Sequence, residues 1–507
     1  MAIEVGGSVS LEDVAAVAAG APVELTPEAT GRMRASRAVV EARVAAGDTV
    51  YGVTTGIGSL ATVRIEPEQA ARLQEDIVRS HATAVGPPLS HGETRAMLFL
   101  RAHVLALGYS GVRPELVELM VEMLNRDVVP VVPQQGSLGA SGDLAPLAHL
   151  ALPLIGGGEA LANGTRLSGA EALERTGLQP LRLQAKEGLA LVNGTQGMLA
   201  VGMLAAHRAR ALAKAADVAA AMTVEAALGT DRPFDERLHR LRPHPGQAAS
   251  AANLRRLLAG SGILESHRES GHLVQDAYSL RCAPQVHGAF RDVLEFAAGV
   301  LEREAASVSD NPVVLPDADE VLSGGNFHGQ PVAVALDALA SAVVSVASIS
   351  ERRLYRLLDP ALNNDLPPFL VADVGLNSGL MLVQYTAASI VSECKSLAHP
   401  ASVDSITSSA GQEDHVSMGM TSARHARECV ANAEVVVALE VLAAAQALDL
   451  RGGRPGPGTA AARSAVRAVV PHLDRDRELG PDIAAAIDLV RGGALVEAVQ
   501  GELGPLS

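Results

Sequence analysis

Five long stretches of this 507-residue chain are rich in alanine, leucine and valine, with charged residues at helical spacing. Helices that are this long and nearly apolar all round must be buried on most of their faces. We therefore expect a mainly α fold built on a bundle of long helices, some of them packed against other copies of the chain. The five stretches are Gln196–Leu228, Phe290–Ser307, Pro331–Leu358, Leu380–His399 and Ser417–Leu450.

Charge and composition exclude several classes of protein. The chain has 41 basic and 57 acidic residues, a net charge of −16, which repels nucleic-acid phosphates and anionic lipid surfaces. Its start lacks a basic region followed by an apolar one, and the apolar stretch after Pro331 is interrupted by Asp337. We expect a soluble cytoplasmic protein without nucleic-acid or membrane partners. Cys282, Cys394 and Cys429 lack CxxC spacing, so we expect free thiols.

Glycine-rich polar segments without a helical period separate the long stretches, and functional sites concentrate in such loops. We expect a mixed N-terminal domain over residues 1–190 and a helical bundle domain over residues 191–507. The loop segments are Tyr51–Leu60, Gln134–Leu144, Ser309–Val313, Ser323–Pro331 and Ser405–Met418.

One of these loops carries a specific motif. Gly136–His149 reads GSLGASGDLAPLAH and resembles the signature of the histidine/phenylalanine/tyrosine ammonia-lyase family. The resemblance implies that Ala140, Ser141 and Gly142 cyclise to a 4-methylideneimidazol-5-one ring. The Gly142 nitrogen must attack the Ala140 carbonyl, which requires a residue without Cβ, and loss of the Ser141 hydroxyl leaves an electrophilic carbon. The sequence after Asp143 predicts a helix, whose positive end would lie near the ring.

Other family motifs follow in order. Tyr51 opens YGVTTGIG, which resembles the loop bearing the tyrosine that exchanges a proton with the substrate β-carbon. Asn193 resembles the asparagine that binds the ring oxygen or the substrate amine. Phe327, in GGNFHG, resembles the aromatic wall over the ring.

A further segment, QDAYSLRCAPQ, matches the family pattern QDxYSxRCxPQ. It carries over Gln275, Tyr278, Arg281 and Gln285, with Tyr278 assigned to catalysis and the other three to substrate binding. An amino-acid substrate brings a carboxylate, and the planar guanidinium of Arg281 offers two parallel donors to hold it.

Two segments of the sequence indicate which amino acid is the substrate. Family members that act on histidine resemble this chain at Ser80-His81 and at Gln412-Glu413-Asp414-His415. His81 and Glu413 can hydrogen-bond an imidazole, whereas a carboxylate facing a phenyl ring would be left unsatisfied. Histidine is therefore the expected substrate. Thr83-Ala84 and Gly411 depart from the family pattern, and we assign supporting roles to Asp310, Asn311, His328 and Asp414.

The resemblance implies a subunit of the fumarase/aspartase-like helical type, in a homotetramer whose active sites draw residues from three subunits. It also implies elimination of ammonia from an aromatic amino acid, giving trans-urocanate if the substrate is histidine. HExxH and GK[ST] motifs are missing, so we expect neither a metal nor a nucleotide cofactor. The alternatives are phenylalanine or tyrosine ammonia-lyase, a 2,3-aminomutase with the same ring, a ring-free lyase of the fumarase/argininosuccinate-lyase type, and an inactive scaffold.

Overall fold

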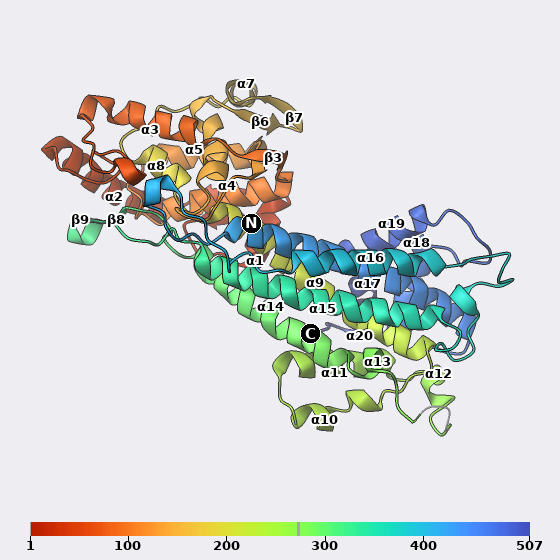
Figure 1. Cartoon of the computed structure of the whole chain (residues 1–507). Helices are drawn as coiled ribbons and strands as arrows, with labels where there is room; N and C mark the ends of the chain where they lie inside the picture. Colours follow the sequence, from red (N-terminus) through yellow and green to blue (C-terminus); the bar gives the residue numbers. More distant parts are fainter. Residues whose placement is uncertain (1, 271–273) are drawn as a thin grey trace. The chain divides into compact units, whose positions relative to one another are not determined.

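A computed structural model describes residues 2–270 and 274–507 and divides the chain into two compact units (Figure 1). The predicted mainly α fold is confirmed, since the described residues form twenty α-helices and only nine short strands. The predicted domains, residues 1–190 and 191–507, stay a prediction, because the two units are defined by spatial contacts and each is made of three separate segments of the chain. The first unit comprises Met1–His207, Ala297–Asp337 and Pro400–Arg424, and the second Arg208–Phe296, Ala338–His399 and His425–Ser507.

The first unit has a core of helices with small sheets at its margins. Strand β1 pairs with β2 in parallel, and antiparallel pairs join β3 to β5, β8 to β9, and β4 to β6 to β7. Its helices are α1 (Leu11–Ala18), α2 (Pro27–Ala46), α3 (Pro67–His81), α4 (His91–Ala106), α5 (Pro114–Asn125), α6 (Leu144–Ala151), α7 (Gly169–Arg175) and α8 (Glu187–Val192). Its strands are β1 (Ile3–Val5), β2 (Val23–Leu25), β3 (Val85–Pro88), β4 (Val128–Pro130), β5 (Pro133–Gln135), β6 (Glu159–Ala162), β7 (Thr165–Ser168), β8 (Val313–Leu315) and β9 (Glu320–Leu322).

Helix α4 is the central helix of this core. Every residue from Glu93 to Ala106 is buried, and the helix packs against α1, α2 and α5. Its N-terminus is fixed by a capping box in which Ser90 accepts from Glu93 N and Glu93 accepts from Ser90 N. Because α4 is buried all round, its polar residue Arg101 is also fully buried.

All five predicted long helices form. They are α9 (Gln196–Ala226), α14 (Ala283–Ala305), α15 (Gln330–Leu358), α16 (Met381–Leu397) and α17 (Gly419–Arg451). The expected start of α14 at Phe290 was wrong by seven residues. Pro284 lies in the first turn of this helix, where a missing N–H is tolerated, so the proline marks its beginning.

The second unit contains much of these long helices, which run alongside one another in Figure 1. Shorter helices complete it: α10 (Glu236–Arg240), α11 (Pro245–Leu258), α12 (Gly262–Glu265), α13 (Tyr278–Arg281), α18 (Pro457–Val469), α19 (Gly480–Arg491) and α20 (Ala494–Leu503). Cys394 and Cys429 are buried and Cys282 is half-buried, and all three are free, as predicted.

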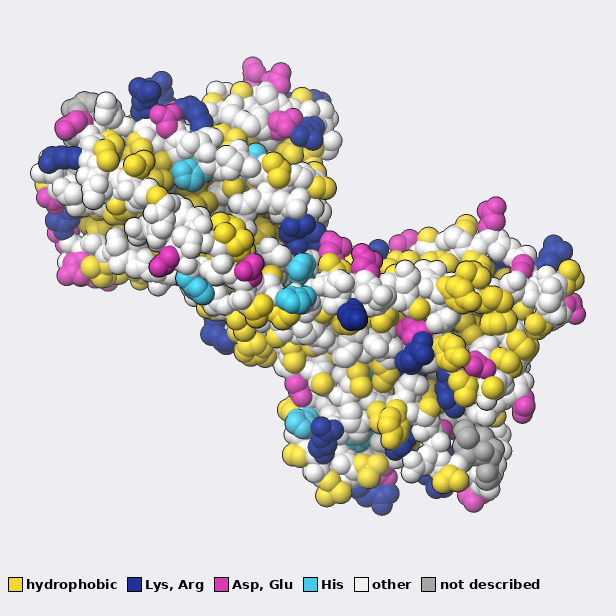
Figure 2. All heavy atoms as spheres, in the orientation of Figure 1, with side chains coloured by type: hydrophobic (Ala, Val, Ile, Leu, Met, Phe, Trp, Pro, Cys, Tyr) yellow, Lys and Arg dark blue, Asp and Glu magenta, His cyan; other side chains and the backbone are white. Residues whose placement is uncertain are grey.

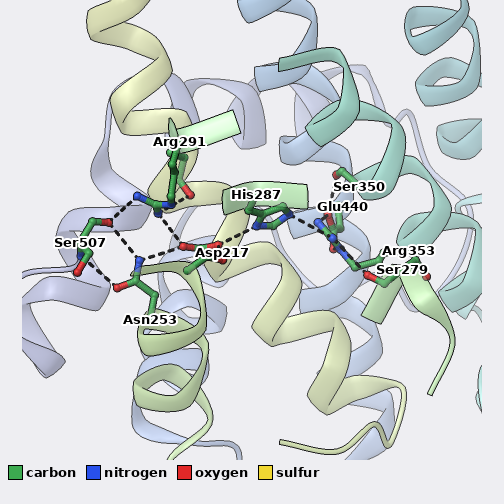
Figure 3. A network of polar contacts seen from close by, with 11 residues as sticks. Asp217, Asn253, Ser279, His287, Arg291, Ser350, Arg353, Glu440 and Ser507 are labelled. Atoms are coloured by element: carbon green, nitrogen blue, oxygen red, sulfur yellow. Dashed lines mark hydrogen bonds and ion pairs between the residues drawn. The ribbon is translucent and has the colours of Figure 1, made fainter. Parts of the chain in front are cut away.

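A buried polar network joins four of the long helices within the second unit (Figure 3). His287 of α14 lies 2.7 Å from Asp217 of α9, and Arg353 of α15 makes a two-pronged ion pair with Glu440 of α17. Arg353 and Glu440 are both fully buried. Such pairs fix the relative position of helices more than they add to stability.

Helix α15 is the one helix among residues 2–270 and 274–507 that is long and apolar enough to cross a membrane, judged by length and composition alone. Its most apolar window has a mean hydropathy of 2.1, yet 56% of that window is buried inside the protein. Asp337 in this helix is buried and accepts a hydrogen bond from Ser402 N at 2.8 Å. The core helix of a soluble protein has the same properties, so this helix is weak evidence for a membrane span.

Candidate active site

A cavity of about 670 Å³ lies in the first unit and is lined by loops that the sequence analysis singled out. This volume is in the range that binds small molecules. Seven of the predicted site residues line it: Tyr51, His81, Ala140, Ser141, Asn193, Phe327 and Glu413. The predicted supporting residues Asn311, His328 and Asp414 line it as well.

The Ala140–Gly142 loop is held against the segment Asn193–Gly194. Gly194 N donates to Ser141 O at 3.2 Å, and Asp143 N donates to Gly194 O at 2.7 Å. Gly142 has a φ of +74°, and a Cβ there would lie 1.9 Å from Gly194 O. No side chain fits at this position, and the backbone is bent in the way that glycine alone adopts readily.

Asp143 immediately precedes α6, as the sequence predicted, and is fully buried. Its carboxylate accepts from Met198 N and Ser137 Oγ, both at 2.7 Å. Burial raises the pKa of Asp143 to about 6 against these hydrogen bonds. The carboxylate therefore fastens the loop to the start of α9.

Asn193 presents an acceptor to the cavity. Its Nδ2 donates to Asp310 Oδ1 at 3.2 Å and to Asn311 O at 2.9 Å. Both partners only accept, so they fix which end of the amide carries the hydrogens. The carbonyl oxygen Oδ1 is then the amide atom available to a ligand, which suits a donor such as an ammonium group.

The Tyr51 loop is anchored by short local hydrogen bonds. Thr54 Oγ1 accepts from Val50 N at 2.9 Å, and buried Gln74 of α3 links Gly52 O to Leu189 N. The half-buried Tyr51 side chain accepts from Gly58 N at 2.9 Å through its hydroxyl. An N–H donor beside the phenol oxygen stabilises negative charge on that oxygen.

His81 ends α3, and its ring orientation is set by the helix. Nδ1 lies 2.8 Å from Ile77 O, a carbonyl that only accepts, so Nδ1 carries the hydrogen. In the neutral ring, Nε2 is then an acceptor. Glu413 adds a second acceptor: its Oε2 takes a hydrogen bond from Ser408 Oγ at 2.7 Å, while Oε1 lies 3.4 Å from Ser141 Oγ.

His328, which follows Phe327 in the chain, lies against His415. The rings of His328 and His415 stack with centroids 5.9 Å apart and planes 3° from parallel. His328 Nδ1 accepts from Gln330 N, and Nε2 lies 3.2 Å from His415 O. Through these contacts His328 joins two of the cavity-lining loops.

Four other predicted site residues belong to the second unit: Tyr278, predicted to be catalytic, and Gln275, Arg281 and Gln285, predicted to bind the substrate. The Arg281 guanidinium lies 4.6 Å from the centre of the Tyr278 ring, and Nε donates to Asp276 O at 3.0 Å. Tyr278 is 71% exposed. Within one chain, the residues lining the cavity do not include these four.

The structure adds residues that sequence reasoning missed. Lys186 is fully buried and lies 2.7 Å from Asp310, and Arg101 is fully buried beside Asn193. No local pattern marks them, because their partners lie 124 and 92 residues away along the chain. Burial of a lysine and an arginine could have been suspected only from the surrounding apolar sequence.

Comparisons with known proteins agree with this arrangement. The family model described as aromatic amino acid lyase matches residues 9–468. A histidine ammonia-lyase from Myxococcus xanthus is 55% identical over 98% of this chain and 97% of its own length. The solved histidine ammonia-lyase from Trypanosoma cruzi matches with a TM-score of 0.92 and 44% identity, covering 99% of this chain and 96% of that one. A solved tyrosine aminomutase from Streptomyces globisporus matches with a TM-score of 0.95 and 38% identity over the whole of both chains.

Proposed function

Because this chain belongs to the aromatic amino acid lyase family, we propose that it eliminates ammonia from L-histidine to give trans-urocanate. The single observation that carries the proposal is that one cavity gathers Ser141 of the Ala-Ser-Gly loop with two acceptors, His81 and Glu413. An imidazole offers one N–H donor when it is neutral and two when it is protonated, and a phenyl ring offers none.

The Ala140–Gly142 loop fits the proposed 4-methylideneimidazol-5-one group. Gly142 has no room for a Cβ, its φ is left-handed, and Ser141 lines the cavity. The group supplies an electrophilic carbon that no ordinary side chain offers. The expectation that neither a metal nor a nucleotide takes part is retained in this proposal.

The chain's own residues divide the remaining tasks. Tyr51, acting as its phenolate, takes the proton from the substrate β-carbon, and Gly58 N stabilises the negative charge on the phenolate oxygen before the transfer. Asn193 Oδ1 accepts from the substrate amine. Phe327 covers one side of the cavity, and His81 with Glu413 holds the imidazole ring.

The carboxylate of the substrate needs a cation, and we assign this task to Arg281 of a neighbouring subunit in a homotetramer. Arg281, Tyr278, Gln275 and Gln285 belong to the second unit, and Tyr278 is largely exposed in the single chain. Figure 2 shows hydrophobic side chains gathered on the helices of the second unit. Phe296 of α14 and Leu382 and Tyr385 of α16 are more than half exposed, which is typical of helices covered by another subunit.

We place the enzyme in the cytoplasm, without a nucleic-acid or membrane partner. The supporting observations are the net charge of −16 and the burial of 56% of the most apolar window of helix α15 inside the protein.

A substrate panel tests the proposal. The purified enzyme is incubated with L-histidine, L-phenylalanine or L-tyrosine, and both the unsaturated acid and any β-amino acid are quantified, with Ser141→Ala as the control. We expect urocanate from histidine with the highest kcat/KM and no product from the control. Faster release of cinnamate or coumarate would overturn the histidine assignment, and a β-amino acid as main product would make the protein an aminomutase.

A further inference from the structure

Three fully buried charged residues, Arg101, Lys186 and Asp310, form a cluster next to Asn193. Lys186 Nζ lies 2.7 Å from Asp310 Oδ2, and Arg101 Nη1 donates to Asn193 O at 2.9 Å and to Gln196 Oε1 at 2.6 Å. None of the three residues lines the cavity, so they do not touch a ligand.

Burying these three charged groups costs free energy of folding. Burial lowers the pKa of Lys186 against the charge of Asp310, and it lowers the pKa of Arg101 to about 10. Arg101 Nε and Nη2 are buried without a hydrogen-bond partner among the described residues. Lys186 also has a φ of +75°, a left-handed conformation that is strained for a lysine. Strain and desolvation of this kind collect at functional sites.

Arg101 and Asp310 both contact one short segment, Asn193–Gly194, and Lys186 is linked to it through Asp310. Asp310 accepts from the Asn193 side chain, and Arg101 donates to the Asn193 carbonyl. Arg101 is packed so closely that a Cβ on Gly194 would lie 2.4 Å from its Nη1. The other edge of the same segment pairs with Ser141–Asp143. The segment Asn193–Gly194 therefore connects the cluster to the Ala140–Gly142 loop by hydrogen bonds.

We propose that Arg101, Lys186 and Asp310 are positioning residues for ring formation: they hold Asn193–Gly194 against the loop so that Gly142 N reaches the Ala140 carbonyl carbon. The inference rests on the proposed function. A C–N bond forms, and the Ala140 oxygen leaves as water with the amide hydrogens of Gly142 and Ser141. The Ser141 hydroxyl leaves as a second water with the Ser141 Cα hydrogen, so no oxidant or further reactant is needed.

The second unit offers a matched control. Arg353 and Glu440 are also a fully buried cation and carboxylate in contact, but they belong to the network of Figure 3 in the other unit. Lys186→Met and Arg353→Met each remove one buried cation and leave one buried carboxylate. Both variants should lose stability, whereas only Lys186→Met should affect ring formation.

The experiment follows the intact mass of the full chain during cell-free synthesis, taking the soluble folded fraction at successive times. We expect wild type and Arg353→Met to become lighter by two waters, and Lys186→Met and Asp310→Asn to do so roughly 10- to 100-fold more slowly, since small misplacements of reacting atoms have effects of this order. Arg101→Lys, which keeps the charge but shortens the reach to Asn193, is measured alongside in case Lys186→Met does not fold.

Equal rates of water loss in wild type and in the folded cluster variants would overturn the inference and leave the proposed function standing. Equal slowing in Arg353→Met would also overturn it, because the effect would then follow stability alone. A wild-type chain that keeps its full mass would refute the proposed function itself, and with it this inference.

Discussion

Replacing Glu413 by glutamine should separate histidine from other aromatic substrates. The carboxylate is half-buried, and one of its oxygens is already bound by Ser408 Oγ at 2.7 Å. The other, Oε1, lies near Ser141 Oγ at 3.4 Å, which places it beside the reacting centre. Glutamine keeps the size of the side chain and removes its charge.

The expected loss follows from one hydrogen bond to a charged group. Such a bond contributes about 1.5–3 kcal/mol, which corresponds to a fall in kcat/KM for histidine of roughly 10- to 150-fold. A phenyl ring makes no such bond, so turnover of any residual phenylalanine should change little. His81→Leu should shift preference in the same direction, because it removes the second acceptor and adds an apolar wall.

The assay compares kcat/KM for histidine and phenylalanine in wild type, Glu413→Gln and Ser408→Ala. The serine variant is the control, since it removes the bond that holds the carboxylate but keeps the charge. If Glu413 only holds its loop, both variants would depress the two substrates alike and lower the unfolding midpoint together. That result would refute a role for Glu413 in recognising imidazole.

Two further predictions concern other parts of the chain. Arg281→Lys loses the two-pronged geometry toward the substrate carboxylate, so kcat/KM should fall, by an amount that corresponds to about 2–4 kcal/mol of transition-state binding free energy. The fold should survive. Unchanged kinetics would show that the carboxylate binds elsewhere. Burial lowers the pKa of His103 from 6.5 to about 4. The unfolded chain therefore takes up this proton first as the pH falls. The free energy of unfolding should therefore be about 2 kcal/mol lower at pH 5 than above pH 6.5 through the effect of His103. His103→Asn, which can still accept from Gly6 N, should reduce that pH dependence in urea unfolding, and an identical dependence would contradict the assignment.

Sequence reasoning predicted the long helices well, because their signal is local and repeats along each helix. Gln196–Leu228 was expected and α9 ends at Ala226, and Ser417–Leu450 was expected and α17 runs from Gly419 to Arg451. The short strands were not predicted, since most contain only three residues and are too short to show alternation.

Site residues that belong to sequence motifs could be predicted. Site residues that pair with residues far away along the chain were missed. The loops of Tyr51, Ser141 and Glu413 meet at one cavity, as their family motifs suggested. The Lys186–Asp310 pair has no sequence signature, because the same two residue types are surface charges in most proteins. The residues of the segment after Gln275 could be named from the motif, but the motif does not indicate which residues they contact, and in the proposed homotetramer those contacts depend on assembly.

The most direct test of the central claim is the mass of the peptide that contains Ala140, Ser141 and Gly142. The purified enzyme is digested, and this peptide is sequenced by tandem mass spectrometry alongside the same peptide from Ser141→Ala. We predict a wild-type peptide lighter than its sequence by two waters, with the loss confined to these three residues, and a variant that cannot lose the serine hydroxyl. A wild-type peptide of full mass, from enzyme that still releases ammonia from histidine, would contradict the claim that the chain makes its own electrophile.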